Sequence, residues 1–156
     1  MNGSSLPKGL QIGSLLTLVT GVSLFLIAAY SMVMLYAGLA DPTQLWRSGG
    51  FGGTSRFSLN DVKACSSAVA NEFVRDQHIE LAHMLNSGFA AALITLFGLR
   101  RRQKWAWYGL LAIFLWLGGN DLLAVLGAGQ PPMPLIPAVI GLTGLFIARR
   151  SIFAGG

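Results

Sequence analysis

The sequence predicts an all-α protein: a bundle of four transmembrane helices with both termini in the cytoplasm and a short extracytoplasmic helical cap between the first two helices. Hydrophobic residues make up 53% of the 156-residue chain and charged residues only 11%, about half the charged share of a typical soluble protein. Long apolar stretches alternate with short polar ones, and the strongest cationic clusters stand directly beside the apolar stretches. Polar side chains are too few to cover this much apolar surface. We therefore expect a single integral membrane domain, residues 1–156, with lipid as its main solvent.

The first membrane helix is predicted over residues 11–39, a stretch without Asp, Glu, Lys, Arg or His. A helix needs about 20 apolar residues to cross a bilayer. A signal peptide is the alternative, but the apolar run is about twice the length of a typical signal core, which favours a retained helix. Gly13, Thr17 and Gly21 recur every four residues, so one face of this helix can approach a neighbouring helix closely.

The segment 41–77 is the only sizeable polar part of the chain and is predicted to be the outer loop. Its glycine-rich stretch, residues 49–53, is expected to be a flexible linker. Ser58 followed by Asp61 is typical of a helix start, with Ser58 as the cap and Asp61 near the positive end of the helix dipole. We expect a short amphipathic helix from there to about Arg75, lying as a cap on the outer membrane surface.

The second and third membrane helices are predicted over about residues 78–99 and 105–127. The second is polar where it begins and apolar over its later part. The third begins with Trp107 and Tyr108 close to a cationic turn, which is typical of an aromatic anchor at the membrane interface.

The fourth membrane helix is predicted over about residues 135–148, after an uncharged, proline-rich hairpin at residues 129–134. Proline lacks a backbone donor, so this hairpin is not expected to be helical throughout. The predicted helix is short for a span. Gly141 and Gly144 give it a face suited to close packing.

Cationic clusters predict the orientation of the chain. Two spans separate the turn between the second and third helices from Arg149 and Arg150, so the two clusters fall on the same side of the membrane. Cationic residues favour the cytoplasmic side, which places both termini there and the long loop outside. The same pattern indicates a bacterial inner (plasma) membrane and leaves no basic module for nucleic acid. The turn also has a second candidate role, contact with anionic lipid head groups or a partner; its cations are Arg100, Arg101, Arg102 and Lys104.

A candidate site lies where polar residues of two consecutive helices reach the same depth. Asp121 lies sixteen positions after Trp105, roughly 24 Å from the cytoplasmic interface. Glu80, His83 and Asn86 are spaced i, i+3, i+6 and share one helical face near the outer end. Ionisable residues in a span usually face a protein interior or a wet cavity. We expect a small, outward-opening pocket for a ligand, formed by Glu80, His83, Asn86, Trp116, Asn120 and Asp121.

A structural interpretation of the same residues stays open. Glu80 can mark the water-exposed start of the helix, while His83 and Asn86 can form hydrogen bonds between helices. Asp121 can pair with His83 to fix the packing. No catalytic residue is assigned, although a carboxylate beside His83 could exchange protons.

The sequence does not predict a metal site or identify a cofactor. Glu80, His83 and Asp121 could supply three ligands, but no His pair at i, i+4 and no HExxH motif is present. Phosphate-loop, dinucleotide and haem-attachment motifs are likewise missing from the sequence. Cys65, the single cysteine, is expected to be a small, half-buried residue or, alternatively, a cross-link to a partner.

The run from Gly98 to Trp107, GLRRRQKWAW, follows a helix that carries histidine. In this respect the chain resembles small four-helix bacterial inner-membrane proteins whose function is unassigned. It is more faintly similar to four-helix modules of the sterol-isomerase type, which carry acidic residues and histidine within their spans. The resemblance implies the fold and transfers no site residue.

These observations favour a non-catalytic function. The chain is expected to be an accessory membrane subunit or a lipophilic-ligand-binding protein with a polar pocket near the outer leaflet. Its expected partners are membrane lipid and either a larger membrane complex or further copies of itself. The alternative is a membrane enzyme or proton-coupled carrier that uses Glu80, His83 and Asp121.

Overall fold

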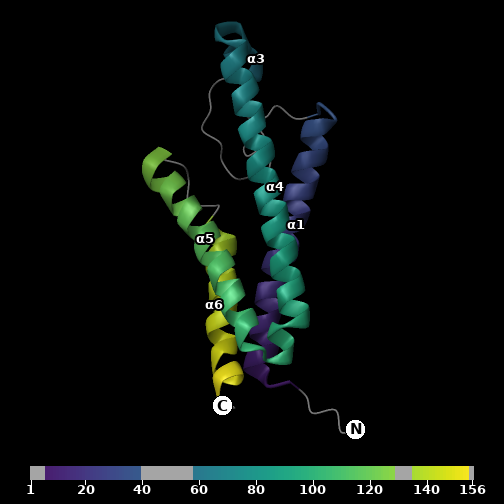
Figure 1. Cartoon of the computed structure of the whole chain (residues 1–156), viewed down its shortest axis with the longest axis vertical. Coiled ribbons are helices and arrows are strands. Elements are labelled where there is room, and N and C mark those ends of the chain that lie inside the picture. Colours follow the sequence, from purple (N-terminus) through teal and green to yellow (C-terminus); the bar gives the residue numbers. More distant parts are fainter. Residues whose placement is uncertain (1–5, 40–57, 129–134, 155–156) are drawn as a thin grey trace.

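The computed structural model describes residues 6–39, 58–128 and 135–154, and within these ranges all regular structure is helical (Figure 1). This agrees with the all-α prediction. The predicted flexible linker at residues 49–53 and the hairpin at 129–134 lie outside the described residues. The elements, in chain order, are α1 (Lys8–Tyr36), α3 (Leu59–Cys65), α4 (Ser67–Phe97), the 3-10 helix η1 (Leu99–Arg101), α5 (Lys104–Ala128) and α6 (Leu135–Phe153).

Four of these helices, α1, α4, α5 and α6, are long and apolar enough to cross a membrane. In the most apolar part of each, only 22% to 39% of the residues are buried inside the protein. Large apolar side chains on the outside therefore remain uncovered, among them Leu26 on α1, Phe97 on α4, Leu115 on α5 and Phe146 on α6. Water is a poor solvent for such a surface. Four long helices with such surfaces indicate an integral membrane protein.

The helices pack as two pairs that join at one end (Figure 1). α1 lies beside α4 along much of its length and also packs against α6, while α5 packs mainly against α6. α4 and α5 touch each other much less, and they diverge from the end at which the two termini of the chain lie (Figure 1). α1 is thus the helix that holds the two pairs together.

Glycines let α1 approach both of its neighbours. A Cβ atom on Gly13 would lie 2.4 Å from the Gly144 carbonyl oxygen of α6, and one on Gly88 of α4 would lie 2.5 Å from the Phe25 amide nitrogen. Gly141 similarly faces the ring of Phe114. The predicted close approach is confirmed, but it takes place within the chain. These glycine faces are consequently not free to meet a partner protein. An accessory subunit would instead present such faces to its partner.

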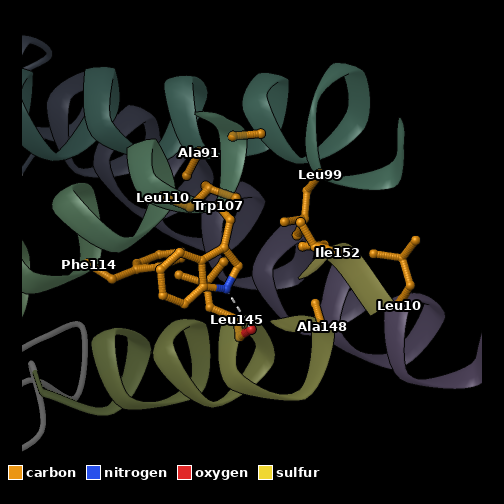
Figure 2. Packing of buried hydrophobic residues seen from close by; sticks show 10 residues of the cluster. Leu10, Ala91, Leu99, Trp107, Leu110, Phe114, Leu145, Ala148 and Ile152 are labelled. Atoms are coloured by element: carbon orange, nitrogen blue, oxygen red, sulfur yellow. Dashed lines mark hydrogen bonds between the residues drawn. The ribbon is translucent and has the colours of Figure 1, made fainter. Parts of the chain in front are cut away.

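The buried core lies at the end where the four long helices and η1 meet (Figure 2). Its largest member is Trp107, whose indole N–H donates a hydrogen bond to the Leu145 carbonyl oxygen of α6 at 2.9 Å. The Trp107 ring also meets Tyr108 and Phe153 edge to face. The prediction that Trp107 anchors the chain at the membrane interface is therefore wrong, because its side chain is only 7% exposed. Trp105 and Tyr108 are the exposed aromatic residues of this region.

The second membrane helix is longer than its apolar part. α4 begins at Ser67 rather than near residue 78, because Ser66 caps it by accepting a hydrogen bond from the Val69 amide at 3.4 Å. At 31 residues it is about 46 Å long, whereas a bilayer core is about 30 Å thick. Hydropathy identifies only the apolar part of a helix. The polar turns between Ser67 and residue 78 continue the helix, but their composition resembles that of a loop.

The predicted cap helix begins where expected and ends early. Ser58 and Asp61 form a full capping box, with the Asp61 amide 3.2 Å from the Ser58 hydroxyl and the Ser58 amide 2.8 Å from the Asp61 carboxylate. The helix stops at Cys65, and the extended backbone of Ser66 separates it from α4. The segment up to Arg75 was predicted to belong to the cap, but from Ser67 onward it belongs to α4.

The last helix, α6, continues past the predicted end at residue 148 to Phe153. Arginine is a good helix former, and a cation near a helix C-terminus interacts favourably with the helix dipole. Arg149 and Arg150 therefore extend the helix rather than end it. At 19 residues α6 is close to the length that a span requires.

Candidate functional site

The six predicted site residues lie on two helices. α4 carries Glu80, His83 and Asn86, all exposed on the protein surface, and α5 carries Trp116, Asn120 and Asp121. Trp116 is 68% exposed and Asn120 is also exposed, whereas Asp121 is half-buried. α4 and α5 are the two helices that diverge towards this end of the bundle (Figure 1).

Glu80 of α4 and Asp121 of α5 interact electrostatically, because the negative charge of Glu80 acts on the Asp121 carboxyl group. The predicted ligand pocket around them stays a prediction. Two like charges do not stabilise the packing of the helices that carry them. The pair is therefore a poor candidate for hydrogen-bonding glue between α4 and α5.

His83 is not joined to this carboxyl pair. Across the described ranges, no hydrogen bond or ion pair links His83 to Glu80 or Asp121, and the ring is exposed. The suggested pairing of Asp121 with His83 is thus not present in the structure. Residues 6–39, 58–128 and 135–154 also contain no group of three His, Cys, Asp or Glu side chains placed to hold a metal ion.

His78 has a structural role that the sequence did not indicate. Its Nδ1 lies 2.8 Å from the Val74 carbonyl oxygen, four residues earlier on α4. The ring also packs on Tyr36 of α1, with 4.8 Å between ring centroids. His78 therefore ties α4 to the end of α1.

Buried hydroxyl groups supply a polar contact between α1 and α4. The Oγ1 atoms of Thr95 and Thr17 lie 3.3 Å apart, and each hydroxyl also bonds a carbonyl oxygen of its own helix. Within the described chain, no buried side-chain polar atom lacks a hydrogen-bond partner. The sequence placed Thr17 on the small-residue face of its helix but did not indicate Thr95, because threonine is common in spans. These hydrogen-bonded hydroxyl groups differ in this respect from the like-charged Glu80 and Asp121.

The cationic turn lies where α4 ends and α5 begins, whereas Glu80 lies near the middle of α4 and Asp121 in the last third of α5. Arg100, Arg101, Arg102 and Lys104 are all exposed. Arg102 adopts a left-handed backbone conformation with φ of 58°, which lets the chain reverse between η1 and α5. The two charged features of the sequence are consequently separated along the bundle axis.

Comparison of the chain with protein-family models, with curated proteins and with solved structures gives no match. The functional argument therefore rests on the residues and geometry of this chain.

Proposed function

We propose that this integral membrane protein binds a lipophilic molecule between α4 and α5, with the polar group of that molecule received by Glu80 and Asp121. The observation that carries the proposal is the electrostatic interaction of these two carboxyl groups, one of them half-buried, on helices that separate towards that end. Ionisable groups in a span are costly and usually serve a site.

The chemistry of the pair defines the ligand's polar group. Repulsion between two carboxylates is relieved by a cationic group or by a hydrogen-bond donor that both carboxylates can accept from. In the described structure the ion pairs of acidic side chains involve Glu72 and Asp76 with Arg75, not Glu80 or Asp121. We therefore expect a ligand with an amine or several hydroxyl groups.

Apolar side chains beside the carboxyl groups suit the rest of such a molecule. Ile79 stands next to Glu80, and Leu122 and Leu123 follow Asp121; all three are exposed. Trp116, one turn before Asn120 on α5, adds a large exposed ring. An amphiphile could place its tail along these residues and its head between the carboxylates.

Two other functions receive less support from this geometry. An accessory subunit would direct small-residue faces and large apolar surfaces at a partner, and the structure places the small-residue faces inside the bundle. The enzyme or carrier hypothesis used His83 together with Glu80 and Asp121, and within the described ranges no hydrogen bond or ion pair joins His83 to either carboxyl group. The location of the site in the outer leaflet follows from the predicted orientation and is part of the proposal.

The proposal is tested by the molecules that remain bound to purified protein. Native mass spectrometry and solvent extraction of the full chain should detect a bound amphiphile, and Asp121→Asn and Glu80→Gln should lose it. Loss of a charge-assisted hydrogen bond, about 1.5–3 kcal/mol, corresponds to roughly ten- to hundredfold weaker binding.

Asp76→Asn is the matched control, because Asp76 is an exposed acid of the same helix that faces Arg75. It should retain the molecule as the unmodified chain does. Equal retention by all variants, or a chain that carries no amphiphile even after incubation with a mixed lipid extract, would contradict the proposal.

A further inference from the structure

Seven cationic residues lie where α1 begins, in the segment from η1 to the start of α5, and in the last turns of α6. These three segments meet at one end of the bundle (Figure 1). All seven are exposed. The acids in the described ranges lie on α3, on the first half of α4 and beyond the middle of α5, towards the other end. We propose that this cationic end binds anionic phospholipid head groups. Its residues are Lys8, Arg100, Arg101, Arg102, Lys104, Arg149 and Arg150.

Three of the seven cations, Arg100 to Arg102, lie on a turn that packing and hydrogen bonds hold in place. Leu99 is fully buried, and it packs in one cluster with Leu10 of α1 and Ile152 of α6 (Figure 2). The turn that follows is closed by hydrogen bonds from the Arg102 amide to the Leu99 carbonyl at 2.9 Å and from the Gln103 amide to the Gly98 carbonyl at 3.1 Å. A preorganised turn loses little conformational entropy when a ligand binds.

Close packing brings the three cationic segments together. Gly9, next to Lys8, faces the Ile147 carbonyl oxygen and the Ser151 hydroxyl of α6, so the start of α1 lies on the last turns of α6. Lys104 at the start of α5 places its Nζ 5.9 Å from the centroid of the Phe153 ring. The clusters that are far apart in sequence therefore form one surface.

The positive potential of this surface comes from side chains and not from helix dipoles. α1 and α5 begin at this end, whereas α4 and α6 finish here. Two positive and two negative dipole ends largely cancel. Arginine, which supplies five of the seven cations, binds phosphate through two parallel N–H groups, so a phosphate ester is the matching ligand.

The position of the surface favours a lipid over a free phosphate. It lies where the four apolar helices come to their ends, at the level of lipid head groups if the helices cross the membrane. Trp105 and Tyr108, both 57% exposed, stand beside the cations. Such amphipathic rings prefer the head-group region of a bilayer.

The test uses the full chain in detergent, titrated with phosphatidylglycerol or phosphatidylcholine and read by native mass spectrometry. We expect phosphatidylglycerol to be retained at least about tenfold more strongly, with the preference falling as salt is raised. Replacing Arg100, Arg101 and Arg102 with Gln should remove most of that preference. A second variant, Arg149→Gln with Arg150→Gln, should lower it even if the triple variant fails to fold.

The control variant carries Lys63→Gln and Arg75→Gln, two exposed cations on α3 and α4 at the other end. It should keep the full preference. Inorganic phosphate at the same phosphate concentration should not displace the lipid. Equal retention of the two lipids, an equal loss in the control, or displacement by inorganic phosphate would each overturn the proposal.

Discussion

At the scale of single residues, the bundle depends on the absence of side chains at a few positions. Gly88 of α4 lies against the backbone of α1, with its missing Cβ 2.5 Å from the Phe25 amide nitrogen and 2.8 Å from the Gly21 carbonyl oxygen. Backbone atoms cannot move aside individually as a flexible side chain can. A methyl group at this position must push the two helices apart.

Gly88→Ala should therefore destabilise the protein, by about 1–3 kcal/mol as is typical of overpacking. A thermal unfolding midpoint measured in detergent would show the loss. Gly119→Ala is the matched control, because a Cβ there would meet nothing within 4 Å. That change should leave stability unchanged or raise it by up to about 1 kcal/mol, since alanine is a better helix former. Equal midpoints for the two variants would show that the α1–α4 approach is looser than described.

At this scale the sequence predicted one kind of contact and missed another. The spacing of Gly13 and Gly21 indicated a close helix approach, which the structure confirms, while the ligand pocket around Glu80 and Asp121 stays a prediction. The burial of Trp107 was not predictable, because it depends on which face of α5 meets α6. Interfacial tryptophans and core tryptophans have the same neighbours in sequence; only packing separates them.

At the scale of elements, polar segments obey capping rules that hydropathy does not detect. Ser58 caps α3 with a complete capping box, whereas Ser66 caps α4 through one longer contact of 3.4 Å. The first of these was read from the sequence. The second was not, since residues between Ser66 and residue 78 are too polar to resemble a span. The apolar stretches thus predicted all four long helices and misplaced the start of α4 and the end of α6.

Ser58→Ala should unfold α3 locally while leaving the bundle intact. Removal of an N-cap costs about 1 kcal/mol, which is a large loss for a helix of seven residues that buries no side chain. Amide hydrogen exchange in bicelles should become about fivefold faster over residues 59–65. Ser67→Ala, an exposed serine inside the first turn of α4, should leave that exchange unchanged. Unaltered exchange in Ser58→Ala would mean that packing on α4 holds α3 without its cap.

At the scale of the whole molecule, the two charged features are separated along the bundle. The cationic surface lies where α1 and α5 begin and α4 and α6 end (Figure 1). Glu80 lies near the middle of α4 and Asp121 in the last third of α5. Hydropathy and charge together predicted this polarity. They did not predict that α1 would lie between α4 and α6, because the order of packing depends on small-residue faces that can pair in several ways.

The central claim is that the four helices cross the membrane with the cationic end in the cytoplasm. Cys65 offers a direct test, because it is the single cysteine of the chain and is exposed at the end of α3. The measurement is labelling of intact bacterial cells with a membrane-impermeant maleimide. The matched reporter is Gln103→Cys in a Cys65→Ser background, which moves the thiol to the exposed turn after η1. We predict that Cys65 is labelled in intact cells and that the residue 103 thiol is labelled only after the membrane is opened. The reverse pattern, or labelling of both positions in intact cells, would contradict the orientation and with it the placement of the Glu80–Asp121 pair in the outer leaflet.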